Sequence, residues 1–114
     1  MAKNVYLVFS KRPEGISAGD YDRWYEAHAQ ENIESPGFLT ARRFNVTPQR
    51  GNEGPFEHLA LYEYEGTQEQ WRTDLSGRIE SGDVKLPEWF PQITFGGWDC
   101  EPASGLLTPA RLAG

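Results

Sequence analysis

The chain has 114 residues, 38% of them hydrophobic, which fits one small domain with a thin core. Its formal net charge of −6 argues against nucleic acid or an anionic membrane surface as a partner, because both require a basic footprint. The absence of an apolar membrane span, the lack of a signal-peptide pattern and the single cysteine, Cys100, together predict a cytoplasmic protein without an internal disulfide.

The first part of the chain predicts a strand, a helix and a second strand. Residues 5–9 form a short apolar run rich in β-branched and aromatic side chains, and we expect a strand that is buried on both faces. Residues 17–34 have helical spacing, with Ser17 as a candidate N-cap and a Ser-Pro-Gly stop signal after the last turn. Residues 38–46 alternate loosely and predict the second strand.

The second part again predicts a strand, a helix and a strand, after a connector at residues 47–57 that is rich in Gly, Pro and charge. Residues 59–64 alternate and should pair with the preceding strand as a long-looped hairpin. Thr67 and Gln70 have capping-box spacing and open a second helix, which ends at a Ser-Gly-Asp sequence. Residues 89–98 predict an aromatic-rich last strand, in which a Gly-Gly pair indicates a bulge or a close backbone approach.

This element order predicts one domain over residues 1–100, followed by an extended arm over residues 101–114. Two split β-α-β units give a ferredoxin-like α+β sandwich, in which both helices lie on one face of an antiparallel sheet. The first strand is apolar on both sides, yet two helices can cover only one side. We therefore expect a second subunit on the other side, that is, a homodimer.

The inward side of the first predicted helix is unusually polar. At about 100° per residue, five positions share this side: Tyr21, Trp24, Tyr25, His28 and Asn32. A helix that only packs would place aliphatic residues there, and each buried polar group left unpaired costs about 1–3 kcal/mol. These groups need partners, which are each other, water or a ligand. We interpret the side as one wall of a small-molecule pocket, with core packing as the alternative.

Residues on the predicted strands are candidates to complete this pocket: Arg43, His58 and Tyr62. His58 and Tyr62 share one face of the third strand, and Arg43 lies on the second. The alternation leaves open which strand face meets the helices. It also leaves ordinary roles open, with His58 as a strand-edge residue and Arg43 as the partner of a surface carboxylate.

No cofactor is expected from the motifs of the chain. There is no HExxH, no Cys/His cluster, no carboxylate triad with metal-ligand spacing and no glycine-rich nucleotide loop. His28 and Glu31 are three residues apart, but two ligands do not make a metal site. His28 remains the titrating group best suited to acid–base chemistry on a carbonyl compound, with tyrosines able to hydrogen-bond to a developing enolate.

Two stretches resemble the EthD-like branch of the dimeric α+β barrel proteins. They are Tyr-x-x-Trp-Tyr-x-x-His at residues 21–28 and Pro-Gly-Phe-Leu-Thr-Ala-Arg-Arg-Phe at residues 36–44, and the strand at 59–63 is similar as well. The resemblance covers most of residues 4–100. It implies a ferredoxin-like subunit that pairs sheet to sheet into a barrel, with a pocket that contains the residue matching His28. Haem is not expected, because the arrangement of haem-degrading relatives has no counterpart here.

The resemblance also implies a range of activities on small, often aromatic or polyketide-like compounds, so the fold alone does not select one. Our first hypothesis is a cofactor-independent enzyme that transfers protons, in an isomerisation, dehydration or cyclisation, on a small aromatic, lactone or polyketide-like carbonyl compound. His28 would be the acid or base. The alternatives are a cofactor-free monooxygenase of an electron-rich aromatic compound and a non-catalytic small-molecule binding protein.

Overall fold

Four strands and two helices make up the part of the chain that the computed structural model describes, residues 3–49 and 54–112. In chain order they are β1 (Asn4–Lys11), α1 (Ala18–Ile33), β2 (Phe38–Asn45), β3 (His58–Tyr64), α2 (Gln68–Ser81) and β4 (Thr94–Cys100). Two short 3₁₀ turns, η1 (Phe90–Gln92) and η2 (Ala110–Leu112), precede and follow β4. The predicted order of strands and helices is confirmed.

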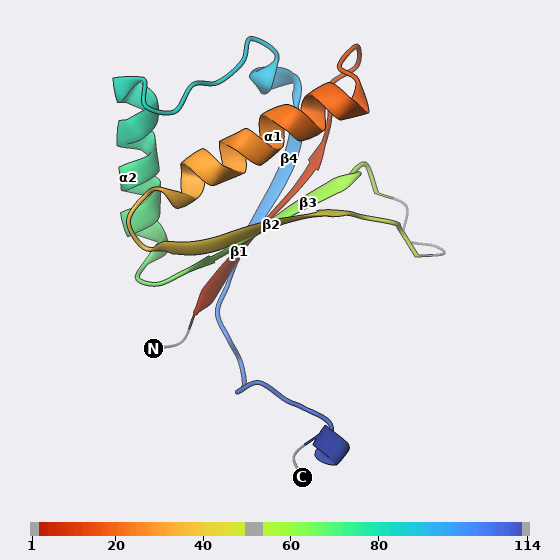
Figure 1. Ribbon diagram of the computed structural model, residues 1–114, viewed down its shortest axis with the longest axis vertical. Helices are drawn as coiled ribbons and strands as arrows, with labels where there is room; N and C mark the ends of the chain where they lie inside the picture. The colour runs from red at the N-terminus through yellow and green to blue at the C-terminus, as the bar shows by residue number, and fades with distance from the viewer. Residues whose placement is uncertain (1–2, 50–53, 113–114) are drawn as a thin grey trace.

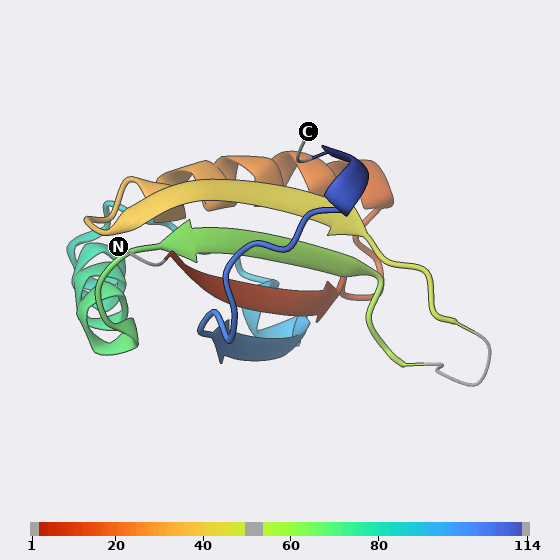
Figure 2. The same ribbon diagram turned by 90° about the horizontal axis from the view of Figure 1, so that it is seen from below.

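The strands form one antiparallel sheet in the order β2-β3-β1-β4. β2 and β3 pair as the predicted hairpin, and β1 lies between β3 and β4. Both helices cover the same face of this sheet (Figure 1), and Figure 2 shows the strands from the opposite side. The molecule is therefore the ferredoxin-like α+β sandwich that the sequence predicts.

Strand register decides which side of β3 meets the helices, a question that the alternation left open. The side chains of β3 that lie under the helices are all buried: His58, Ala60, Tyr62 and Tyr64. Arg43 of β2 pairs with Ala60 and so lies on this side, whereas Arg42 pairs with Leu61 on the other. The second side is called the open face here, and its main apolar residues are Val5, Leu7, Phe9, Phe44, Leu59, Leu61 and Trp98.

Both helices begin where the sequence signals predict. The Ser17 hydroxyl accepts a hydrogen bond from the backbone N–H of Asp20, which caps α1. Thr67 and Gln70 form a complete capping box at the start of α2. Gly82 ends α2 with a φ of 86°, in the left-handed region that favours glycine. These local signals set where both helices begin and where α2 ends.

The expectation of one continuous strand over residues 89–98 is wrong in its first part. Trp89 and Phe90 lie in a turn and in η1, and β4 begins only at Thr94. The backbone N–H of Phe90 donates to the carbonyl of Pro87, and that of Gln92 donates to the carbonyl of Trp89. Pro91 has no N–H to offer a strand ladder, so the segment folds into a turn and places two aromatic side chains over α1.

The glycine pair within β4 marks a close approach and not a bulge. β4 keeps a continuous register with β1 through Gly96 and Gly97. A Cβ atom at Gly96 would lie 2.9 Å from Cζ of Phe56, and one at Gly97 would lie 3.1 Å from the hydroxyl oxygen of Tyr6. Side chains of the neighbouring elements fill the space that larger residues would need.

Both helices lie on the other side of the sheet, so in the described residues the open face of β1 is only partly covered and β1 is not buried on both faces. Leu7 and Phe9 on this face are half-buried, whereas Val8 on the helix side is buried. After β4, residues 101–112 leave the sheet on the side opposite the helices (Figure 1). Within the described parts of the chain, no helix is long and apolar enough to cross a bilayer.

Candidate functional site

The inward side of α1 rests on the sheet mainly through its two tyrosines. Tyr21 is completely buried and Tyr25 is 3% exposed, and both belong to the core cluster with Val8, Ala60 and Tyr62. Neighbouring residues Trp24 and His28 are only half-buried. The predicted side of the helix thus divides into a buried tyrosine edge and a more accessible Trp24–His28 edge.

Some polar groups of the buried edge find partners within the protein, whereas Oδ1 of Asn32 has none. The Tyr21 hydroxyl donates a hydrogen bond of 2.8 Å to Oγ of Ser10, and Nδ2 of Asn32 donates one of 3.2 Å to the Tyr62 hydroxyl. Burial raises the pKa of Tyr62 to about 12, against hydrogen bonds from Asn32 and Tyr25 that lower it. Burial likewise raises the pKa of Tyr25 well above its ordinary value. These phenols are therefore neutral at physiological pH.

His28 lies in an aromatic enclosure on the accessible edge. Its ring stacks on Trp24 with 4.8 Å between ring centroids and 16° between planes, and it meets Tyr25 and Phe90 edge-on. Nδ1 of His28 is buried and has no hydrogen-bond partner. Burial lowers the pKa of His28 to about 4, so the ring is neutral at physiological pH and can accept a proton.

Trp89 and Phe90 complete this enclosure, and the sequence analysis did not assign them to the site. Trp89 lies 4.8 Å from Trp24 and 6.0 Å from Tyr21, measured between ring centroids. Phe90 contacts Trp24 and His28 and also packs against Phe95 of β4. The prolines at 87 and 91 were the available signal, because they favour a turn at this point over a continuous strand.

His58 occupies a separate, more charged place on the tyrosine edge. It is 8% exposed, its ring lies 5.1 Å from that of Tyr21, and neither ring nitrogen has a hydrogen-bond partner. Burial lowers the pKa of His58, and the nearby charge of Arg43 lowers it further. His58 is thus a second neutral imidazole. Tyr21 contacts both His58 and Trp24, and so it separates His58 from Trp24 and His28.

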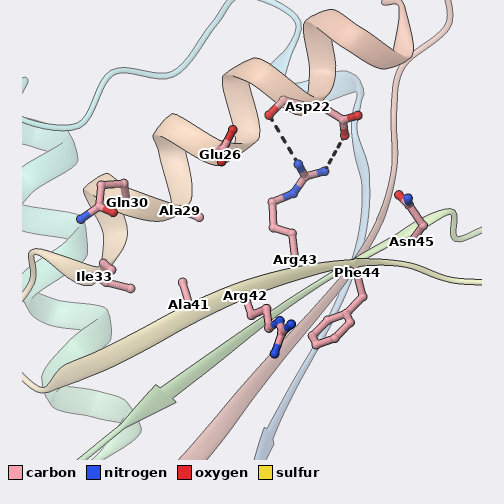
Figure 3. A pocket seen from close by; sticks show the side chains of 10 residues that line it. All are labelled: Asp22, Glu26, Ala29, Gln30, Ile33, Ala41, Arg42, Arg43, Phe44 and Asn45. Atoms are coloured by element: carbon pink, nitrogen blue, oxygen red, sulfur yellow. Dashed lines mark hydrogen bonds and ion pairs between the residues drawn. The ribbon is translucent and has the colours of Figure 1, made fainter.

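Arg43 ties the edge strand β2 to α1. Its guanidinium donates to a carboxylate oxygen of Asp22 at 2.9 Å and to the Asp22 backbone carbonyl at 3.4 Å (Figure 3). It also lies over the ring of Tyr25 at 4.8 Å. Arg43 therefore forms the ion pair with a surface carboxylate that was expected as its ordinary role.

An open cleft of about 540 Å³ lies between α1 and β2, next to Arg43. Figure 3 shows the side chains that line it: Asp22, Glu26, Ala29, Gln30, Ile33, Ala41, Arg42, Arg43, Phe44 and Asn45. Of the residues expected in the pocket, this lining includes Arg43 and not His28 or the tyrosines. The cleft and the His28 enclosure are therefore two different places on the two sides of α1.

The residues that the sequence pointed to thus form a continuous aromatic cluster. Ring contacts of 5.3–5.8 Å link Tyr21, Trp24 and Tyr25 to one another, and each of them leads to a different polar group. Tyr21 leads to His58, Trp24 to His28, and Tyr25 to Arg43. Residues 3–49 and 54–112 contain no group of three or more His, Cys, Asp or Glu side chains that could hold a metal ion.

Solved structures of other proteins resemble this chain, whereas comparisons of its sequence find no match. The sequence matches no family model and no curated protein. A protein of Arabidopsis thaliana superimposes with a TM-score of 0.69 at 10% identity, over 91% of this chain and 99% of that one. A dimeric ferredoxin-like protein from an uncultured marine organism gives a TM-score of 0.58 at 15% identity, over 93% and 100% of the two chains.

An ethyl tert-butyl ether d (EthD) family protein from Bacillus halodurans is also similar. It gives a TM-score of 0.53 at 18% identity, over 86% of this chain and 97% of that one. At these identities the likeness concerns the fold. The chain has the ferredoxin-like fold of EthD-like and dimeric α+β proteins, as the motifs at residues 21–28 and 36–44 indicated.

Proposed function

We propose that this protein is a cofactor-independent enzyme that transfers a proton on a small aromatic, lactone or polyketide-like carbonyl compound. The observation that carries this proposal is the His28 ring, which is neutral, stacked on Trp24 and has a buried Nδ1 without a partner. A proton acceptor inside an aromatic enclosure suits a flat, conjugated substrate. In this proposal the substrate reaches His28 at the half-buried Trp24–His28 edge.

The low pKa of His28 restricts the substrate class. A base whose pKa is about 4 removes only protons that are already acidic, such as one between two carbonyl groups or one on a phenol. In an isomerisation, the neutral imidazole takes the proton from one carbon, electron density moves onto the carbonyl oxygen, and the imidazolium returns the proton to another atom. The indole N–H of Trp24, whose ring stacks on His28, is the candidate to donate a hydrogen bond to that oxygen.

The remaining expected site residues have supporting positions in this proposal. Tyr21, Asn32 and Tyr62 fix the inner wall through their hydrogen bonds. Arg43 and His58 flank it, and Arg43 holds the Tyr25 ring by lying over it. Trp24 and Phe90 would contact the substrate directly.

We also propose that the enzyme works as a homodimer in the cytoplasm, with two copies meeting at their open faces. Trp98 is 53% exposed and Phe44 is 40% exposed on this face, which is unusual for such large apolar side chains in a monomer. One structural neighbour is described as a dimeric ferredoxin-like protein. The single cysteine supports a reducing compartment.

Deuterium exchange tests the proton transfer without knowledge of the natural product. The wild-type protein is incubated in D₂O with aryl 1,3-dicarbonyl compounds and aryl lactones, and loss of the C–H signal is followed by NMR. We expect His28→Ala to slow the exchange by about 10²–10⁴-fold, because a positioned base contributes this much. Arg23→Ala, on the solvent side of α1, should leave the rate unchanged.

The outcomes separate the competing functions. An exchange rate for His28→Ala within about threefold of wild type would exclude His28 as the base. A ligand that raises the melting temperature of the wild type without any exchange would favour a binding protein. Oxygen consumption with a hydroquinone substrate would instead favour the monooxygenase alternative.

A further inference from the structure

Residues 101–112, which we call the arm, extend away from the body of the subunit. They follow β4 and run out on the open-face side of the sheet, opposite both helices (Figure 1). Figure 2, seen from this side, shows the arm in front of the strands. The longest dimension of the molecule is 52 Å. The arm therefore occupies the space that a second copy would enter when two open faces meet.

The arm exposes leucines that gain nothing from water. Leu106 is 94% exposed, Leu107 is 85% exposed and Leu112 is 69% exposed. Three apolar side chains on one short segment are not needed for solubility, and they stabilise the protein only if another surface covers them. Pro102 and Pro109 restrict the backbone of the arm and reduce the entropy lost when it binds.

The cleft between α1 and β2 has both apolar and charged side chains in its lining. Its walls include apolar side chains from both elements, Ala29 and Ile33 on α1 and Ala41 on β2. Glu26 brings a carboxylate to this cleft, in which Asp22 is already paired with Arg43, and Arg111 is the basic residue of the arm. β2 is also an edge strand, so one side of its backbone has no neighbouring strand.

From these observations we propose that, in a dimer, the arm of each copy packs into the α1–β2 cleft of the other. This inference rests on the pairing of open faces proposed above. A twofold axis along the strands sets β4 of one copy beside β2 of its partner, and the arm continues directly from β4. An extended segment from residue 101 to residue 107 spans roughly 20 Å, enough to pass a sheet about 10 Å away and reach its helix layer.

A disulfide trap tests this arrangement in the full-length chain. In a Cys100→Ser background, Gln30→Cys places a thiol at the cleft and Leu107→Cys places one on the arm. Mild oxidation should convert most of this double variant to a covalent dimer on a non-reducing gel. The matched control combines Leu107→Cys with Glu80→Cys on the exposed side of α2, and it should give far less.

A second measurement follows the strength of the dimer. Leu106→Ser combined with Leu107→Ser should raise the dimer dissociation constant by at least about tenfold, as expected when two buried leucines lose their contact. Leu86→Ser, which removes an exposed leucine from another segment, should leave the constant unchanged.

The results distinguish a failure of the proposed arm exchange from a failure of the proposed dimer. A dimeric wild type whose double-cysteine variant forms only an intrachain disulfide, or no disulfide, would overturn the exchange of arms while the pairing of open faces stands. A monomeric wild type would overturn both. Neither result bears on the exchange chemistry of His28, which is measured separately.

Discussion

At the scale of single residues, the two histidines show how surroundings divide the chemistry. Both imidazoles contain buried nitrogens without a partner, and burial lowers the pKa of both. His28 is surrounded by aromatic rings, whereas His58 lies near the charges of Arg43, Asp22 and Glu57. Our proposal places a flat ligand beside a base in the aromatic enclosure, and for this reason His28 is the better candidate.

The lowered pKa of His28 makes the stability of the fold depend on pH. The ring is neutral in the folded state down to pH of about 4, whereas in the unfolded chain it binds a proton near pH 6.5. The free energy of unfolding should therefore decrease as the pH falls from 6.5 to 4, by about 3 kcal/mol from this residue, and change no further from it below pH 4. Urea unfolding across this pH range measures the effect.

The comparison for this prediction is His28→Gln, which keeps a polar side chain but cannot titrate. Carboxylates contribute to the pH dependence of both proteins, and the difference between the two curves isolates His28. Parallel curves for wild type and variant between pH 6.5 and 4 would show that the imidazole is not excluded from water as described.

At the scale of elements, α1 and η1 together create the enclosure. α1 presents Trp24 and His28 along one edge, and η1 places Phe90 over them. The turn depends on hydrogen bonds from Phe90 to the Pro87 carbonyl and from Gln92 to the Trp89 carbonyl. Phe90 also packs against Phe95 in β4, which joins this cover to the sheet. The turn that carries Phe90 is therefore held to the fold by hydrogen bonds and by aromatic packing.

Removing the Phe90 side chain should return the pKa of His28 toward its ordinary value. Phe90→Ala admits water to the ring, and we expect the pKa of His28 to rise from about 4 toward 6.5. NMR titration of the imidazole C–H signals measures it, with His58→Gln as the background so that one histidine is observed. Leu86→Ala, in the same segment, is the control and should leave the pKa near its original value. An unchanged pKa in Phe90→Ala would mean that other groups bury the ring.

At the scale of the whole molecule, the two faces of the sheet differ in what covers them. The helix side is filled by tyrosines and tryptophans, whereas in the described residues the open face presents exposed apolar side chains such as Trp98 and Phe44. A four-stranded sheet with one bare apolar face is completed most simply by a copy of itself, because a twofold axis matches each surface to its own equivalent.

A charge in the middle of the open face should separate the two copies. Leu61 pairs with Leu7 at the centre of the sheet, and Leu61→Glu would bury a carboxylate in the proposed interface. We expect this variant to sediment as a monomer while the wild type sediments as a dimer. Leu86→Glu introduces the same charge elsewhere and should remain dimeric. A dimeric Leu61→Glu protein would show that the copies associate through another surface.

Local signals in the sequence were sufficient for the elements of this protein. Ser17, the Thr67–Gln70 box and the glycine at 82 are read by the backbone within a few residues, and the helices begin and end where they indicate. The alternation of apolar residues predicted the strands, and their order was enough for the ferredoxin-like fold. It failed at residues 89–93, where two prolines outweighed the aromatic pattern and produced a turn.

Tertiary structure decided what the site residues meet. The sequence placed Tyr21, Trp24, Tyr25, His28 and Asn32 on one side of a helix, but a helical pattern cannot say which rows of that side are covered. Cross-strand register put His58 and Tyr62 beneath the helix, and Arg43 beside it with Asp22. Register and the path of η1 depend on contacts between residues far apart in the chain. The sequence therefore determined the fold and the chemical groups, and packing alone decided that His28 is the imidazole enclosed by aromatic rings.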